Sequence, residues 1–154
     1  MDNRTPVQRS HTMSRIKSRD TSPEIEVRHL LFLEGYRYRK NVSNLPGSPD
    51  IAFLGRRKAV FVNGCFWHMH KGCANSKIPA TRQIYWKAKL TNNVARDRRN
   101  YAELKALGWE IAIVWECELA NLVMLKRRLI KFLGAPSNQK ARLVQKSLRQ
   151  SRKD

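Results

Sequence analysis

Three cysteines and a histidine have the residue types and the spacing of a zinc site. Cys65, His70 and Cys73 share one short segment, and Cys117 follows far downstream at the end of an expected strand. Zinc takes four thiolate and imidazole ligands in tetrahedral geometry, and a site without an open position is structural. We therefore expect a structural zinc that pins an irregular loop to the sheet edge. Three buried free thiols beside an exposed histidine are the alternative.

A second group offers oxygen ligands for magnesium. Asp50 starts an expected strand directly after Pro49, and the next strand ends near Val62. Antiparallel pairing would bring backbone carbonyls close to the Asp50 carboxylate, and magnesium prefers such hard oxygen atoms, with water and phosphate as further ligands. Glu24, on the preceding helix, can face the same sheet edge. A simple Pro-Asp turn is the alternative.

His68 lies inside the expected zinc loop but is not needed among the four ligands. Histidine can take a proton from water or give one to a leaving oxygen near neutral pH. A carboxylate that binds the second ring nitrogen would fix the tautomer, and Asp97 is a candidate for this role. The residues alone also leave His68 open as a zinc ligand and Asp97 as a partner in a helical salt bridge.

Aromatic residues surround this histidine in the sequence. Phe66 and Trp67 precede it in a glycine-flanked segment, and Trp86 follows on the next expected helix. Aromatic side chains beside basic residues can stack on bases or wedge between base pairs. Packing in the core is the alternative, and the glycine-flanked segment favours the wedge.

The charge of the 154-residue chain indicates a polyanionic partner. It has 31 Lys and Arg against 12 Asp and Glu, a net charge of +19, and 42% hydrophobic residues, enough for one buried core. Nucleic acid is the commonest polyanion for such a chain, with a merely soluble basic surface or a membrane-surface binder as the alternative. We expect no disulfide, no membrane span and no secretory signal. The expected location is cytoplasmic.

The sequence predicts a helix, a three-strand meander, a long helix, a strand and a last helix, which together would position these groups. Pro23 and Glu24 suit the first turn of a three-turn helix that Gly35 can end. The other expected elements are strands at 36–42, 50–54 and 59–62, an irregular segment at 63–80, a helix at 81–107 with a break near 91–93, a strand at 109–115 and a helix at 119–133. One mixed β-sheet flanked by helices, an α/β fold, is the economical arrangement.

Several of these residues stand in motifs that are familiar together. The motifs are Pro49-Asp50, Phe61-Val-Asn-Gly-Cys-Phe-Trp-His68, Pro79-Ala-Thr81, Asn93-Val-Ala-Arg-Asp-Arg-Arg99, and Gly108-Trp109 leading to Val114-Trp-Glu-Cys117. With them the chain strongly resembles the very short patch repair (Vsr) DNA mismatch endonucleases, from about Met13 to Cys117. The resemblance implies a restriction-endonuclease-like fold. It also implies a magnesium-dependent nick in one DNA strand at a T:G mismatch left by deamination of 5-methylcytosine.

The resemblance implies a role for each candidate residue. Asp50 and the main-chain carbonyl of Val62 would bind Mg²⁺, Glu24 would support the metal-bound waters, and His68 with Asp97 would transfer protons. The implied zinc ligands are Cys65, His70, Cys73 and Cys117. The implied wedges are Phe66, Trp67 and Trp86 in the major groove, and Met13 and Ile16 of an N-terminal helix in the minor groove.

The domain division follows from the residues and the resemblance together, and the resemblance implies the partners and action at the bacterial nucleoid. We expect an N-terminal DNA-contacting arm or helix at 1–20, an endonuclease domain at 21–134 and a basic C-terminal tail at 135–154. The expected partner is double-stranded DNA with a T:G mismatch, bound by a monomer, with functional coupling to a cytosine methyltransferase and a repair polymerase. Two other classes stay open: a non-catalytic zinc-containing DNA-binding protein and a basic RNA-associated protein.

Overall fold

The structure is a computed structural model that describes residues 19–136. Its elements in chain order are α2 (Ser22–Leu33), β1 (Arg39–Lys40), β2 (Ile51–Phe53), β3 (Lys58–Asn63), the 3₁₀ helix η1 (Ala74–Ser76), α3 (Gln83–Ala106), β4 (Glu110–Trp115), the 3₁₀ helix η2 (Glu116–Ala120) and α4 (Leu122–Leu133). Met13 and Ile16, with most of the arm and tail expected at 1–20 and 135–154, lie outside the described residues.

The four strands form one mixed sheet in the order β1-β2-β3-β4. The pairs β1–β2 and β2–β3 are antiparallel, whereas β3 and β4 run parallel with Val62 opposite Val114. A parallel pair requires a crossover connection, and α3 supplies it. This topology confirms the expected α/β class, although the strand expected at 36–42 is only two residues long.

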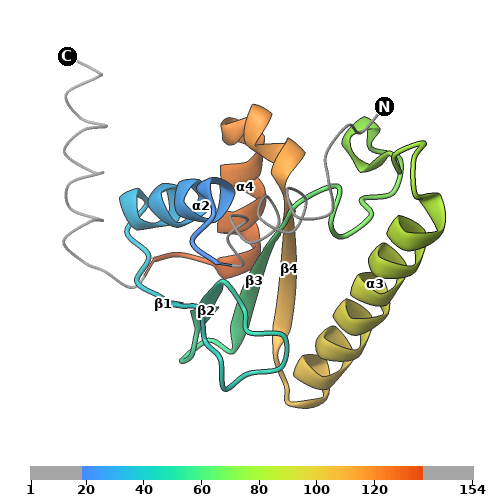
Figure 1. Cartoon of the computed structure of the whole chain (residues 1–154). Helices are drawn as coiled ribbons and strands as arrows, with labels where there is room; N and C mark the ends of the chain where they lie inside the picture. Colours follow the sequence, from blue (N-terminus) through green and yellow to red (C-terminus); the bar gives the residue numbers. More distant parts are fainter. Residues whose placement is uncertain (1–18, 137–154) are drawn as a thin grey trace.

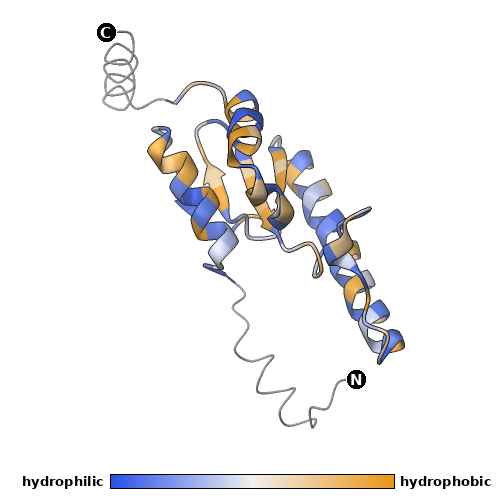
Figure 2. Cartoon of the chain, turned by 90° about the horizontal axis from the view of Figure 1, so that it is seen from above, coloured by the Kyte–Doolittle hydropathy of each residue, from blue (hydrophilic) through white to orange (hydrophobic). Residues whose placement is uncertain are grey.

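Helices cover both faces of the sheet because alternate residues of its central strands point to opposite sides. Val60 and Val62 pack in the same core as Leu31 of α2 and Leu129 of α4. The opposite face packs against Leu104 of α3. Figures 1 and 2 show the sheet between α3 and the pair formed by α2 and α4. Most of α3 is polar (Figure 2), which leaves its side chains available for a site.

Two helices differ from the sequence prediction. The break expected near 91–93 is absent, since α3 is continuous from Gln83 to Ala106. The Asn93 side chain donates to the main-chain oxygen of Trp67 at 3.1 Å instead of competing for the helix backbone. The last helix begins at Leu122 rather than 119, because the chain first forms η2. No helix within residues 19–136 is long and apolar enough to cross a membrane.

Candidate active site and metal centre

A cavity of about 580 Å³ lies between α2, the sheet and α3. It is lined by all five residues expected to bind magnesium and transfer protons: Glu24, Asp50, Val62, His68 and Asp97. One wall depends on Gly47, whose φ is +77° and where a Cβ would lie 3.0 Å from the Cβ of Asn100. Only glycine lets this loop approach α3 so closely without strain. The fold therefore assembles residues that are far apart in the sequence.

Asp50 precedes β2, and its carboxylate reaches the end of β3. Its Oδ2 accepts a hydrogen bond from the Val62 N–H at 2.7 Å. Burial raises the pKa of Asp50 to about 6, the Val62 hydrogen bond opposes this shift, and the nearby Glu24 charge adds to it. Near neutral pH the cavity thus holds a desolvated negative charge, which a bound cation would stabilise.

Glu24 is fixed by a network of polar groups at the start of α2. It is 4% exposed and accepts a hydrogen bond from the Asp20 N–H at 2.7 Å. Arg28 donates to the Asp20 carboxylate at 2.8 Å and lies 3.9 Å from the Glu24 carboxylate. Asn41 donates to the same Asp20 oxygen at 3.0 Å. The network ties α2 to the loop before β2 and sets the position of Glu24.

His68 and Asp97 form a close pair across the cavity wall. The His68 Nδ1 and the Asp97 Oδ2 are 2.5 Å apart, and the two side chains are 23% and 16% exposed. This contact orients the ring and leaves Nε2 as the nitrogen that can exchange a proton with a ligand in the cavity. The cysteines gather around His70 rather than His68.

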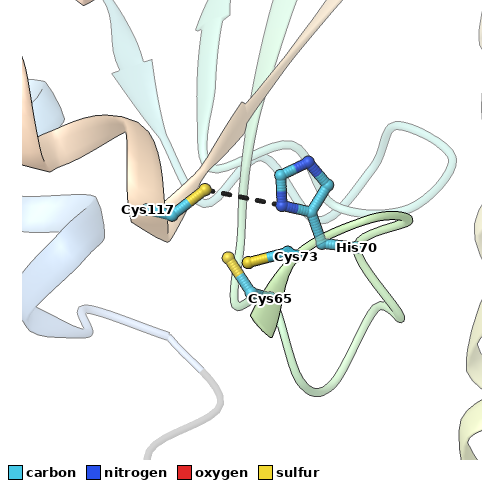
Figure 3. A group of neighbouring side chains, drawn as sticks. All are labelled: Cys65, His70, Cys73 and Cys117. Carbon is cyan, nitrogen blue, oxygen red and sulfur yellow. Dashed lines mark hydrogen bonds between the residues drawn. The ribbon is translucent and has the colours of Figure 1, made fainter. Parts of the chain in front are cut away.

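The four expected zinc ligands meet at one point (Figure 3). The ligand atoms of Cys65, His70, Cys73 and Cys117 all lie within 4.8 Å of one another. Cys117 belongs to η2 at the end of β4, so the cluster joins the 64–73 loop to the sheet edge. The His70 ring also stacks on Trp115, with centroids 4.1 Å apart and planes 7° apart. Three thiols and one imidazole at a single point are a donor set consistent with a structural zinc site.

Phe66, Trp67 and Trp86, which we call the aromatic triad, pack edge to face near the N-terminal end of α3. Their ring centroids lie 5.1, 5.4 and 5.9 Å apart. The rings are half-buried and belong to neither core cluster. The Lys89 Nζ lies 5.9 Å from the Trp67 ring centroid, and the neighbouring Ile84 is 89% exposed. The triad thus lies outside the described core clusters, beside a cation.

Sequence reasoning missed two polar residues of the cavity, Asn63 and Tyr101. Both line it, and the Asn63 Nδ2 donates to the Tyr101 Oη at 3.0 Å. Burial raises the pKa of Tyr101 to about 12. Their spacing was the available signal, because Tyr101 lies four residues after Asp97 on the same helix face and Asn63 directly follows Val62.

The chain is similar to known DNA mismatch endonucleases and nicking enzymes. A family model described as "DNA mismatch endonuclease Vsr" matches residues 1–75. The chain is 46% identical over 132 residues to the type II nicking enzyme V.XorIIP of Xanthomonas oryzae pv. oryzae, covering 86% of this chain and 96% of that protein. It is 42% identical to the type II nicking enzyme V.NmeAIP of Neisseria meningitidis, over 81% of this chain and 89% of that protein. It is 44% identical to the DNA mismatch endonuclease Vsr of Escherichia coli, over 72% and 70%.

Proposed function

Because the chain belongs to the Vsr family of DNA mismatch endonucleases, we propose that it nicks one strand of duplex DNA at a T:G mismatch in very short patch repair. Family membership makes it a DNA nicking endonuclease, which hydrolyses a phosphodiester bond. The two non-catalytic classes are thereby set aside. The observation that supports the proposed mismatch specificity is the 44% identity to a protein named as a mismatch endonuclease.

The proposed magnesium site is formed by three of the residues that line the cavity. Asp50 would bind the ion directly, Val62 would offer its main-chain carbonyl, and Glu24 would support the metal-bound waters. The oxygen-rich donor set and the desolvated Asp50 carboxylate suit a hard divalent cation. When bound, Mg²⁺ would neutralise the charge that builds on the phosphate and the leaving oxygen.

His68 is the proposed general base. Its Nε2 would take a proton from water as the water oxygen bonds to phosphorus and the bond from phosphorus to the leaving sugar oxygen breaks. The Asp97 carboxylate, 2.5 Å from Nδ1, would stabilise the imidazolium that forms. The pair thus supplies both the proton acceptor and its counter-charge.

A panel of duplexes tests the proposed substrate. The duplexes share one sequence and methylation pattern and differ only in a T:G pair, another mismatch or full pairing. Nicking is measured under single-turnover conditions with Mg²⁺, and the panel is repeated in several flanking sequences. We expect the T:G duplex to be nicked fastest. Equal nicking of the paired duplex would contradict mismatch recognition.

A second candidate is nicking of a fixed, fully paired sequence. It is favoured by the relatives with 46% and 42% identity, which are named type II nicking enzymes. The same panel separates the two candidates, since this activity would depend on the flanking sequence and not on the mismatch.

Trp67→Ala should weaken binding to T:G DNA about tenfold or more while changing the affinity for paired DNA little. Stacking of a base on an aromatic ring contributes about 1–3 kcal/mol, and a wobble pair is easier to unstack than a matched pair. Binding to paired DNA depends mainly on phosphate contacts. Fluorescence anisotropy in Ca²⁺, an ion chosen to slow cleavage, would give both dissociation constants.

Trp109→Ala is the matched control, because Trp109 packs against the core beneath α3. We expect it to lower the melting temperature without selective loss on mismatched DNA. An equal loss of affinity for both duplexes in Trp67→Ala would rule out the wedge.

A further inference from the structure

The cavity is lined both by carboxylates and by hydrogen-bond donors. Its carboxylates belong to Glu24, Asp50 and Asp97. The donors that line it include Asn63, Arg96, Asn100 and Tyr101. The proposed general base and magnesium site use the carboxylates, His68 and a main-chain carbonyl, so the hydroxyl of Tyr101 has no part in the chemistry described above.

The environment of Tyr101 fixes its ring and orients its hydroxyl. The ring packs edge on against Phe61, with centroids 4.9 Å apart. Asn63 is 4% exposed, and its amide donates to the phenolic oxygen at 3.0 Å. Within residues 19–136, this is the only hydrogen bond of the Tyr101 hydroxyl. The phenolic oxygen therefore acts as an acceptor toward Asn63, and its own O–H hydrogen is available to a ligand in the cavity.

We propose that Tyr101 donates its phenolic hydrogen to a non-bridging oxygen of the scissile phosphate, and that Asn63 is the positioning residue that holds this donor. The assignment rests on the cavity being the nicking site proposed above. A phosphate held by the proposed magnesium ion would need hydrogen-bond donors for its remaining non-bridging oxygens, where negative charge builds during attack. A neutral phenol adds such a donor without competing with the cation for the carboxylates.

Tyr101→Phe tests the donor, because it removes one oxygen atom and keeps the ring against Phe61. We expect the single-turnover nicking rate to fall about 10- to 100-fold, the range for losing a hydrogen bond to a charged group. The melting temperature should change by less than about 5 °C. Tyr36→Phe is the matched control: its hydroxyl binds the Gly134 carbonyl, and Tyr36 does not line the cavity. It should nick at the wild-type rate.

Phosphorothioate DNA separates phosphate contact from a structural role. Sulfur accepts hydrogen bonds poorly. Replacing the contacted oxygen by sulfur should therefore slow nicking by the wild-type enzyme more than it slows nicking by Tyr101→Phe. On one diastereomer at the scissile phosphate, the rate ratio between the two proteins should shrink to less than about threefold. A ratio that stays the same on both diastereomers, or wild-type nicking by Tyr101→Phe, would overturn the proposal.

The role of Asn63 is tested through Tyr101. Asn63→Ala should slow nicking, and adding Asn63→Ala to Tyr101→Phe should slow it little further, because both act on one hydrogen bond. If the rate losses of the two single variants multiply fully in the double variant, the positioning role of Asn63 is contradicted. All proteins are compared on whichever duplex the wild type nicks fastest. If the wild type shows no preference for mismatched DNA, the proposed substrate is refuted, but the test of Tyr101 can still be carried out.

Discussion

Asp50→Asn is expected to abolish nicking and, in the absence of divalent cations, to raise the melting temperature. Loss of the proposed direct ligand should remove several kcal/mol of transition-state stabilisation, about a thousandfold or more in rate. The substituted amide keeps an oxygen that can accept the Val62 N–H, so the local structure should persist.

The gain in stability follows from the pKa of Asp50, which burial raises from 3.8 to about 6. The folded state binds this proton more tightly than the unfolded state does. The stability gained from this tighter proton binding is therefore fully present below about pH 4, and it is lost as the pH rises through about 6. Above that pH the ionised group destabilises the metal-free fold by at most about 3 kcal/mol, at 1.36 kcal/mol per pKa unit. Contact with cavity water reduces this cost, so we expect Asp50→Asn to add about 1–3 kcal/mol.

Thermal melts at pH 5 and pH 8, with and without Mg²⁺, measure this effect. The variant should melt higher than the wild type at pH 8 without Mg²⁺, and the difference should shrink at pH 5. Mg²⁺ should stabilise only the wild type. Asp20→Asn is the control, and it should lower the melting temperature at pH 8 instead of raising it. The Arg28 hydrogen bond lowers the pKa of Asp20, so the charged form of this group stabilises the fold. Full nicking activity in Asp50→Asn would exclude Asp50 from the magnesium site.

Local chemistry made part of this site predictable from sequence. The carboxylate of Asp50 and the end of β3 could be placed together because the turn residues between 53 and 58 define an antiparallel hairpin. The candidate zinc ligands were recognisable because Cys65, His70 and Cys73 lie at short spacing and Cys117 is the remaining cysteine of the chain. The choice of His70 over His68 came from the family resemblance. The order and class of the elements followed from hydrophobic periodicity and from Gly and Pro positions.

What sequence reasoning missed depends on tertiary contacts. α3 is continuous where the Asn93 side chain donates a hydrogen bond to the loop at Trp67. Helix propensities describe local preferences and do not include such a tertiary contact. The pairing of Asn63 with Tyr101 requires the crossover helix to lie over the end of β3, and the sequence does not encode that register in a local pattern. Likewise, the position of Glu24 depends on Asp20 and Arg28, which read in the sequence as ordinary surface charges.

Removal of zinc should cause the other large effect, loss of the fold of the 64–80 loop and of nicking. Between β3 and α3 the chain forms only the three-residue helix η1, and its backbone hydrogen bonds are short-range turns such as His70 N–H to the Cys65 carbonyl. The loop also carries His68 and most of the aromatic triad. Structural zinc binding contributes about 10–16 kcal/mol in small domains, as much as or more than the whole stability of a typical domain. We therefore expect the cluster to hold the backbone of this loop in place, while the contacts of His68 with Asp97 and of Trp67 with Asn93 fix the proposed general base against α3.

Purified wild-type protein is accordingly expected to contain one zinc per chain by elemental analysis. His70→Gln should lose the metal, lower the melting temperature by about 10 °C or more and nick at least a hundredfold more slowly. His29→Gln, at an exposed position on α2, should change none of these values. His68→Gln decides between the two roles open to that residue, because a general base can be lost without losing the metal. It should keep its zinc and its melting temperature yet fail to nick. Zinc loss in His68→Gln together with full zinc in His70→Gln would reverse the assignment of the two histidines.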